Sequence, residues 1–187
     1  MEDSYRHKGM RRKLIEGLRN RGIQDERALA AFDKVPRHFF LDRAFVNQAY
    51  SEMAFQIGEG QTISHPYTVA FQTELLNIEK GHRILEIGTG SGFQSAILCA
   101  MCARLVSVER QRCLFLTAME VIKKLGYAPK LFFGDGYKGK PVYAPYDSIL
   151  VTCGAPFLPD ALKEQVKVGG RIVIPIGVGS QQVMTVY

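Results

Sequence analysis

Residues 83–93 read RILEIGTGSGF, and this stretch decides the fold. Its first half is a mainly apolar run that predicts a buried strand, and the residues FQSAIL that follow predict a helix. Between them, Gly88, Gly90 and Gly92 allow a tight turn and let a ligand approach the backbone where the free N–H groups of the helix start point outward. A dinucleotide fingerprint that begins at Gly88 requires glycine at position 93, and the Phe93 found there argues against NAD.

The chain after residue 83 alternates strands with helices. Apolar runs such as SILV (148–151) and RIVIPI (171–176) are typical of strands that are covered on both faces, as in parallel sheets. We therefore predict an α/β fold, a doubly wound, mostly parallel Rossmann-like sheet with an N-terminal helical layer. Strands are expected at 83–88, 104–109, 130–136, 146–154 and 170–177, and helices at 93–102, 112–126 and 158–166.

The segment before the glycine-rich turn predicts helices. Apolar residues recur at helical spacing over 10–18, and Asp25 is suited to begin a second, short helix. With 187 residues, of which 47% are hydrophobic, the chain is long enough to bury one good core. We expect a single domain over 1–187, made of an N-terminal helical layer (1–57), an active-site loop (58–67) and a cofactor-binding α/β core (83–187).

The loop at 58–67, GEGQTISHPY, is expected to be neither helix, strand nor ordinary turn. Its glycines, its proline and its small or amide-bearing polar residues leave the backbone free to present groups to a ligand. Pro66 is suited to the first turn of a helix that continues through YTVAFQTELLNI (67–78). The loop therefore predicts a binding segment placed directly before a helix.

Acidic residues follow the second and third predicted strands. In a doubly wound sheet the ligand lies beyond the carboxyl ends of the strands. Glu109 ends the second strand, where a carboxylate can accept both hydroxyls of a ribose. Asp135 stands between two glycines at the exit of the third, where it can approach an adenine amino group. Together with the glycine-rich turn, these two acids predict a cofactor that contains a nucleoside.

The set EIGTGSG (86–92), a ribose-binding acid and GDG (134–136) resembles the S-adenosylmethionine-dependent methyltransferases of the Rossmann-like class. The loop GQTIS (60–64) before Pro66, with VPRHFF upstream and VTCGAP downstream, resembles the protein-L-isoaspartate O-methyltransferase family. The resemblance implies transfer of a methyl group from S-adenosyl-L-methionine to the free α-carboxylate of L-isoaspartyl residues in damaged proteins and peptides. The product of the cofactor would be S-adenosyl-L-homocysteine, and the partners would be isoaspartyl-containing proteins.

The resemblance also implies roles for individual residues. Ser64 would be the active-site serine. His65, Phe93 and Cys153 depart from the residues that are usual at those positions in the family. The family pattern continues beyond SQQVMTVY (180–187), so the chain is expected to be shortened at its C-terminus. The cofactor site would include Glu86, Gly88, Thr89, Gly90, Gly92, Glu109, Asp135 and Gly136, and the peptide cleft Gln61, Thr62, Ile63 and Ser64.

This chemistry needs positioning more than proton transfer. A substrate carboxylate, with a reference pKa of about 3.3 to 3.9, is already ionised near neutrality, so no general base is required. Ser64 is expected to orient this carboxylate by hydrogen bonding, and to act as neither nucleophile nor base. Adjacent residues in an extended loop point apart, so we do not expect Ser64 and His65 to form a hydrolase pair.

Composition leaves other partners open. The formal net charge is +6, and the basic stretch RHKGMRRK (6–13) could touch nucleic acid, but no aromatic series accompanies it, which favours a solvated helix face. No secretory signal and no apolar run of membrane-spanning length is present, so we expect a cytoplasmic monomer that binds neither membrane nor nucleic acid. The alternatives are a methyltransferase for RNA or a small molecule that uses the basic N-terminus, and a non-catalytic descendant that only binds cofactor or peptide.

No metal site is predicted. His7, His38 and His82 are not expected to form a ligand cluster. The C-x-x-C pair Cys99 and Cys102 lies in an apolar helical segment without a second pair, which favours buried, reduced thiols over zinc.

Overall fold

The computed structural model describes residues 2–178 and 181–187, so that residue 1 of the predicted helical layer and residues 179–180 of the predicted core lie outside it. Within these residues a six-stranded sheet has the order β5-β4-β3-β6-β7-β8. All neighbours pair in parallel except β7 and β8, which are antiparallel. The predicted mostly parallel α/β sheet is confirmed. The strands are β3 (Arg83–Ile87), β4 (Arg104–Glu109), β5 (Lys130–Phe133), β6 (Tyr146–Val151), β7 (Val166–Val178) and β8 (Gln181–Val186).

The strand order reverses beside β3. The chain runs from β3 outward through β4 to β5, and then returns to the other side of β3 with β6. At such a point the two connections leave in opposite directions, which opens a crevice at the carboxyl ends of the strands. The topology therefore places a ligand site beyond β3, β4 and β6.

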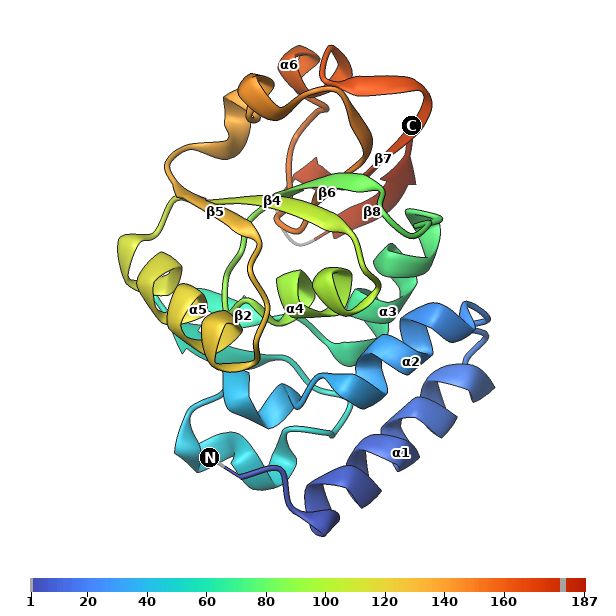
Figure 1. Ribbon diagram of the computed structural model, residues 1–187, viewed down its shortest axis with the longest axis vertical. Coiled ribbons are helices and arrows are strands. Elements are labelled where there is room, and N and C mark those ends of the chain that lie inside the picture. Colours follow the sequence, from blue (N-terminus) through green and yellow to red (C-terminus); the bar gives the residue numbers. More distant parts are fainter. Residues whose placement is uncertain (1, 179–180) are drawn as a thin grey trace.

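Both faces of the central strands β3, β4 and β6 are buried. Ile84, Leu105 and Leu150 point to one face, in a cluster with Leu98 of a covering helix. Residues of the opposite parity along the strands point to the other face, in a cluster with Leu162. This alternation explains the continuous apolar runs in the sequence. Helices α3 (Pro66–Leu75), α4 (Phe93–Ala100) and α5 (Arg112–Lys124) lie on one side of the sheet and α6 (Asp160–Lys163) on the other (Figure 1).

The helix predicted at 158–166 is much shorter in the structure. It is confined to Asp160–Lys163. Pro159 has extended backbone angles before it, and Val166 already pairs with Tyr146 in the sheet. Because this pairing takes the chain into β7, the helical pattern of LPDALKEQV has room for about one turn only.

The N-terminal layer packs beneath α3, α4 and α5 (Figure 1). Asp25 caps α2 by accepting hydrogen bonds from the first-turn amides, as the sequence predicts. Phe32 and Phe40 both meet Phe93 edge to face, at 5.6 and 5.5 Å between ring centroids. The layer is therefore bound to the start of α4. It consists of α1 (Tyr5–Asn20), α2 (Glu26–Lys34) and the 3₁₀ helices η1 (Arg37–Phe40) and η2 (Arg43–Gln48).

The prediction that 58–67 contains no strand is wrong. Strands β1 (Phe55–Gly58) and β2 (Gln61–Ile63) form a small antiparallel hairpin, so the layer over 1–57 is not entirely helical either. Glu59 and Gly60 between them have φ of 52° and 66°, and two left-handed central residues make the turn that suits tight hairpins. These strands are too short to show their alternation clearly in the sequence.

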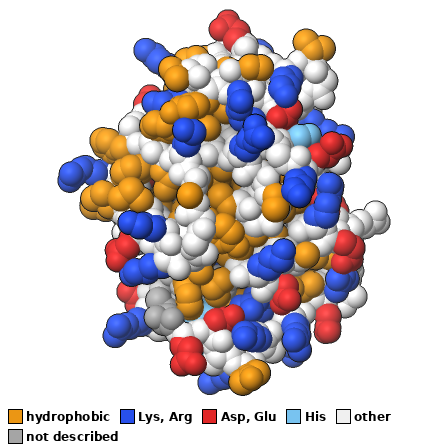
Figure 2. All heavy atoms as spheres, in the orientation of Figure 1, with side chains coloured by type: hydrophobic (Ala, Val, Ile, Leu, Met, Phe, Trp, Pro, Cys, Tyr) orange, Lys and Arg blue, Asp and Glu red, His pale blue; other side chains and the backbone are white. Residues whose placement is uncertain are grey.

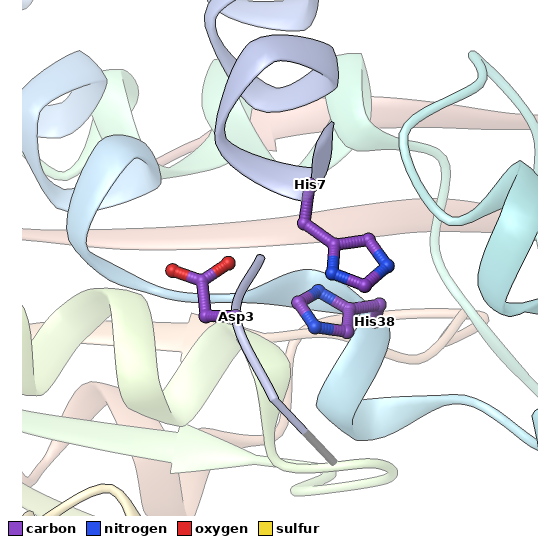
Figure 3. Close-up of side chains that lie close together, drawn as sticks. All are labelled: Asp3, His7 and His38. Carbon is purple, nitrogen blue, oxygen red and sulfur yellow. The ribbon is translucent and has the colours of Figure 1, made fainter. Parts of the chain in front are cut away.

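The expectation that the histidines form no ligand cluster is wrong for His7 and His38, because their ligand atoms and those of Asp3 all lie within 4.8 Å of one another. Their rings stack with centroids 3.9 Å apart, and Asp3 lies beside them (Figure 3). Asp3 accepts two hydrogen bonds of 3.0 Å from the guanidinium of Arg11, which also donates to the Tyr50 hydroxyl at 3.2 Å. His38 Nδ1 lies 2.8 Å from the same hydroxyl. These contacts hold the first residues of the chain against η1.

The four cysteines are free, but they are not all buried. Cys99 is half-buried, whereas Cys102 is exposed, so the expectation of two buried thiols is wrong for Cys102. The reason is local, because Cys102 lies beyond the end of α4 with a left-handed φ of 62°. Cys113 and Cys153 are exposed as well.

The surface mixes charges of both signs. Figure 2 shows Lys, Arg, Asp and Glu side chains interspersed over this face, with hydrophobic side chains gathered toward its middle and left. Among the exposed hydrophobic residues, Tyr137 and Phe157 meet edge to face at 6.5 Å. No helix in the described part of the chain combines the length and the apolar character that crossing a membrane requires.

Candidate active site

A cavity of about 470 Å³ opens at the carboxyl ends of β3, β4 and β6. Its walls come from the glycine-rich turn, the loops after β4, β5 and β6, and the segment Gln61–Ser64. Strand exits and the hairpin, which are far apart in the sequence, therefore share one space. Of the predicted site residues, Gln61, Thr62, Ile63, Ser64, Gly88, Thr89, Gly90, Glu109, Asp135 and Gly136 line the cavity, and Glu86 and Gly92 do not.

The glycine-rich turn needs its glycines for two separate reasons. Gly88 and Gly90 have φ of 96° and 55°, which side-chain-bearing residues rarely adopt. In addition, a Cβ at Gly88 would overlap the Thr152 hydroxyl, which donates to the Gly88 carbonyl at 2.6 Å. The turn thus presents bare backbone to the cavity and is tied to the loop after β6.

Glu109 is held in place by backbone amides. Its side chain accepts hydrogen bonds of 2.8 Å from the amides of Gly90 and Gln111, one on each carboxylate oxygen. Although the residue is only 5% exposed, it lines the cavity. Each oxygen of a carboxylate can accept a second hydrogen bond, so the anchored group still has acceptor capacity for a ligand.

Asp135 lies across the cavity, after β5. It accepts a hydrogen bond of 2.9 Å from the amide of Tyr137 and so caps the short 3₁₀ helix η3 (Gly136–Lys138). A Cβ at Gly136 would overlap the side chain of Ile87. The small residue therefore lets the Asp135 loop approach the end of β3.

Glu86 lies behind the turn instead of in the cavity. It is fully buried and accepts hydrogen bonds from Ser95 and, at 2.7 Å, from Ser107, whose hydroxyl lies 2.6 Å from that of Thr89. Its Oε1 has no hydrogen-bond partner within the described residues. Burial raises the pKa of Glu86 to about 7. Glu86 thus braces Thr89 from beneath.

Gly92 also has a structural position. It precedes the first residue of α4, with φ of 88°, and a Cβ there would press on Ile122 and Ala118 of α5. Its small size lets α4 and α5 pack closely, and this glycine does not contribute to the cavity wall.

One side of the cavity is formed by the end of the hairpin. Ser64 is half-buried, and its backbone carbonyl accepts a hydrogen bond of 2.9 Å from Arg37. His65 accepts a hydrogen bond of 3.2 Å on Nδ1 from the amide of Tyr67 and so caps α3. The histidine next to Ser64 therefore caps the start of a helix.

Two buried amides that the sequence analysis missed also line the cavity. Gln72 on α3 donates to the side-chain oxygen of Gln94 on α4 at 2.6 Å, and Gln94 donates to the Thr73 hydroxyl at 2.9 Å. The two glutamines are 2% and 7% exposed. Gln94 follows the glycine-rich turn directly and could have been considered from its position. Nothing in the local sequence marks Gln72.

Comparisons with known proteins agree with this geometry. The family model described as protein-L-isoaspartate(D-aspartate) O-methyltransferase matches residues 9–187. A protein-L-isoaspartate O-methyltransferase of Christiangramia forsetii is 54% identical over 188 residues, which cover 100% of this chain and 88% of the relative.

Solved structures show the same likeness. A structure of a protein-L-isoaspartate O-methyltransferase superposes with a TM-score of 0.85 at 32% identity, over 95% of this chain and 59% of the other. A Plasmodium falciparum protein, solved with S-adenosyl-L-homocysteine as a candidate member of the same family, gives 0.79 at 24% identity, over 93% of this chain and 87% of the other, and supports the fold. This chain therefore belongs to the protein-L-isoaspartate(D-aspartate) O-methyltransferase family.

Proposed function

We propose that this chain transfers the methyl group of S-adenosyl-L-methionine to the free α-carboxylate of L-isoaspartyl residues in proteins and peptides. The observation that carries the proposal is the single cavity lined both by the glycine-rich turn with Glu109 and by Gln61–Ser64. One space thus offers a nucleoside-binding wall and an acceptor wall. The family, and relatives of that name at 54% identity, support the same activity.

The donor set of the cavity fits this cofactor. Glu109 would accept the ribose hydroxyls, and Asp135 would accept the adenine amino group. Gly88 and Gly90 have no side chain, so their backbone could lie close to the amino-acid end of the cofactor. At Gly88 a Cβ would overlap the Thr152 hydroxyl, so only glycine leaves room there. When bound, S-adenosyl-L-methionine supplies an electrophilic methyl group on a sulfonium.

The residues of the acceptor wall would position and desolvate the carboxylate. An ionised carboxylate needs no base, so the Ser64 hydroxyl would donate a hydrogen bond that orients it. Val69, Phe93 and Ile174 also line the cavity and would exclude water around it. We propose the same role for the peptide cleft as a whole, in which Gln61, Thr62 and Ile63 hold the kinked isoaspartyl backbone.

The proposal is tested by methyl transfer from labelled S-adenosyl-L-methionine to two matched peptides. One contains L-isoaspartate and the other contains L-aspartate at the same position. Because the aspartyl carboxylate is presented from a side chain on a backbone without the extra methylene, we expect the isoaspartyl peptide to react about a hundredfold faster or more. Equal rates on the two peptides, or no transfer to either, would contradict the proposed substrate.

We further propose that residues 1–187 work as one monomeric domain on protein substrates, without a nucleic-acid partner. Several basic residues of the N-terminal layer already have acidic partners, which lowers the charge available to phosphates. Sedimentation of the free protein, and titration with RNA at two salt concentrations, test this. The ion pairs are Arg11–Asp3, Arg19–Glu26, Arg21–Glu52 and Arg27–Asp25.

A further inference from the structure

Arg37 is a buried arginine directly behind the acceptor wall. Its side chain is 1% exposed and donates to the carbonyls of Ala49 at 3.0 Å, Met53 at 3.3 Å and Ser64 at 2.9 Å. The guanidinium also lies over the ring of Phe93, 4.9 Å from its centroid. Arg37 therefore connects the N-terminal layer with Ser64, the residue proposed to orient the acceptor, and with Phe93, the first residue of α4.

This buried charge has no acidic partner in the part of the chain that the structure describes. Within the described residues, no Asp or Glu forms an ion pair with Arg37, and its Nη1 has no hydrogen-bond partner. Buried cations are normally paired, because removing a charge from water is costly. Arg11, which is also buried in the same layer, follows that rule. Arg37 is a charge without a counterion, beside a cavity for which we propose an anionic substrate.

We propose that Arg37 is a positioning residue for the methyl acceptor, which fixes the Ser64 backbone and makes this end of the cavity selective for an anion. The inference rests on the proposed function. Two opposite charges attract each other more strongly in the low-dielectric interior of a protein than in water. The substrate carboxylate would therefore act as the negative partner that Arg37 lacks. Burial lowers the pKa of Arg37 to about 9, with Tyr50 as the titratable neighbour, and the guanidinium is still charged at neutral pH.

The same arrangement favours release of the product. Methyl transfer forms the bond between a carboxylate oxygen and the methyl carbon and breaks the bond between that carbon and sulfur. The electron pair goes to sulfur, so a carboxylate and a sulfonium become a neutral ester and a neutral thioether. Because the ester carries no charge, Arg37 no longer attracts it, and the substrate is bound in preference to the product.

The test compares the binding of two peptides in the absence of a methyl donor. One contains L-isoaspartate, and in the other its α-carboxylate is replaced by a carboxamide of nearly the same shape. Their affinities are measured by calorimetry with S-adenosyl-L-homocysteine present, so the readout does not depend on turnover. The variants are Arg37→Lys, which keeps the charge, and Arg37→Gln, which keeps a donor for the carbonyls without charge. Arg21→Gln is the matched control, because Arg21 stacks on Tyr67 outside the cavity lining.

We expect the parent to prefer the carboxylate peptide, and Arg37→Gln to reduce this preference about tenfold, as the loss of one charge interaction would. Arg37→Lys and Arg21→Gln should keep most of it. If Arg37→Gln lowers the affinity for both peptides equally, Arg37 has only a structural role and the inference is overturned.

Should Arg37→Gln fail to fold, the inference can still be overturned, by a parent that binds both peptides equally or by a folded Arg37→Lys variant that loses the preference. The proposed function is judged separately, by methyl transfer from the parent to the reactive isoaspartyl peptide. A parent that prefers the carboxylate but transfers no methyl group would contradict the function and leave the role of Arg37 in place.

Discussion

The wall proposed to bind the cofactor, which contains Glu109 and the glycine-rich turn, and the wall proposed to bind the acceptor, Gln61–Ser64, are built in different ways. In the cofactor wall, short segments at successive strand exits supply the groups, and Glu109 is fixed by amides of its own loop and of the neighbouring turn. In the acceptor wall, the Ser64 carbonyl is held by Arg37 from another layer, and Gln72 meets Gln94 across two helices. The contacts of the first wall join residues at neighbouring strand exits, as is usual in doubly wound sheets. The contacts of the second wall form only when the N-terminal layer packs on the helices. Changes in the two walls should therefore have separable effects.

The largest effect is expected in the cofactor wall, at Gly88. Gly88→Ala meets both a positive φ and the Thr152 hydroxyl, whereas Gly81→Ala, with φ of 85°, meets open space. We expect Gly81→Ala to lower the free energy of unfolding by about 1 to 2 kcal/mol, and Gly88→Ala by about 2 to 5 kcal/mol with loss of cofactor binding. Urea unfolding and calorimetry provide the two readouts. Equal losses for the two variants would show that the close approach to Thr152 does not matter.

A pH effect should come from Glu86 beneath the glycine-rich turn. Its pKa in the folded protein is raised to about 7 from an ordinary value of 4.5, so its contribution to stability is fully present below the ordinary value and is lost as the pH rises through about 7. Glu86→Gln cannot titrate. Between about pH 4 and pH 8 the parent should lose about 3 kcal/mol of unfolding free energy relative to this variant. Parallel stability profiles for parent and variant would show that Glu86 is not a proton-binding group of the folded state.

Replacing Glu109 should weaken the binding of the cofactor and leave the binding of the peptide unchanged. Glu109→Ala removes the acceptor of the Gly90 and Gln111 amides and of the proposed ribose contact. We expect cofactor binding to weaken by about 1.5 to 3 kcal/mol, with little change in peptide affinity. Glu120→Ala, on the exposed side of α5, is the control. An unchanged cofactor affinity would remove Glu109 from the cofactor wall.

The smallest effect concerns the amide pair between α3 and α4. Gln72→Leu and Gln94→Leu each leave a buried polar partner unsatisfied, whereas the double variant removes both. The double variant should therefore be less destabilised than the sum of the singles, by about 0.5 to 1.5 kcal/mol in a double-mutant cycle. Additive losses would mean that the two side chains act independently.

The sequence predicts the sheet, and it predicts that Gly88, Glu109 and Asp135 come together, because these signals are local. Continuous apolar runs predict the strands, Glu109 ends β4, and Asp135 lies two residues beyond the end of β5. The failures have tertiary causes. The helix at 158–166 is cut short when Val166 pairs with β6, and Glu86 turns to Ser95 behind the turn because alternate residues of a strand face opposite sides.

The limit of prediction from local sequence is clearer at the wall proposed to bind the acceptor. Arg37 lies 27 positions before Ser64, and His7 lies 31 positions before His38, so no local pattern announces either contact. The role of the loop 58–67 came from resemblance, and its hairpin was missed because its strands hold 4 and 3 residues. Contacts that depend on how layers pack cannot be read from spacing along one chain.

The central claim, that Ser64 orients the acceptor in a wall separate from the cofactor, is tested most directly by the turnover of Ser64→Ala on an isoaspartyl peptide at saturating S-adenosyl-L-methionine. The account predicts a kcat lower by about ten- to a hundredfold, the loss of one hydrogen bond to a charged group, with unchanged cofactor affinity. Ser51→Ala, which removes a hydroxyl bound to the Gln48 carbonyl in the N-terminal layer, should behave like the parent. A Ser64→Ala variant as active as the parent, or one that loses cofactor affinity in proportion to its activity, would contradict the account.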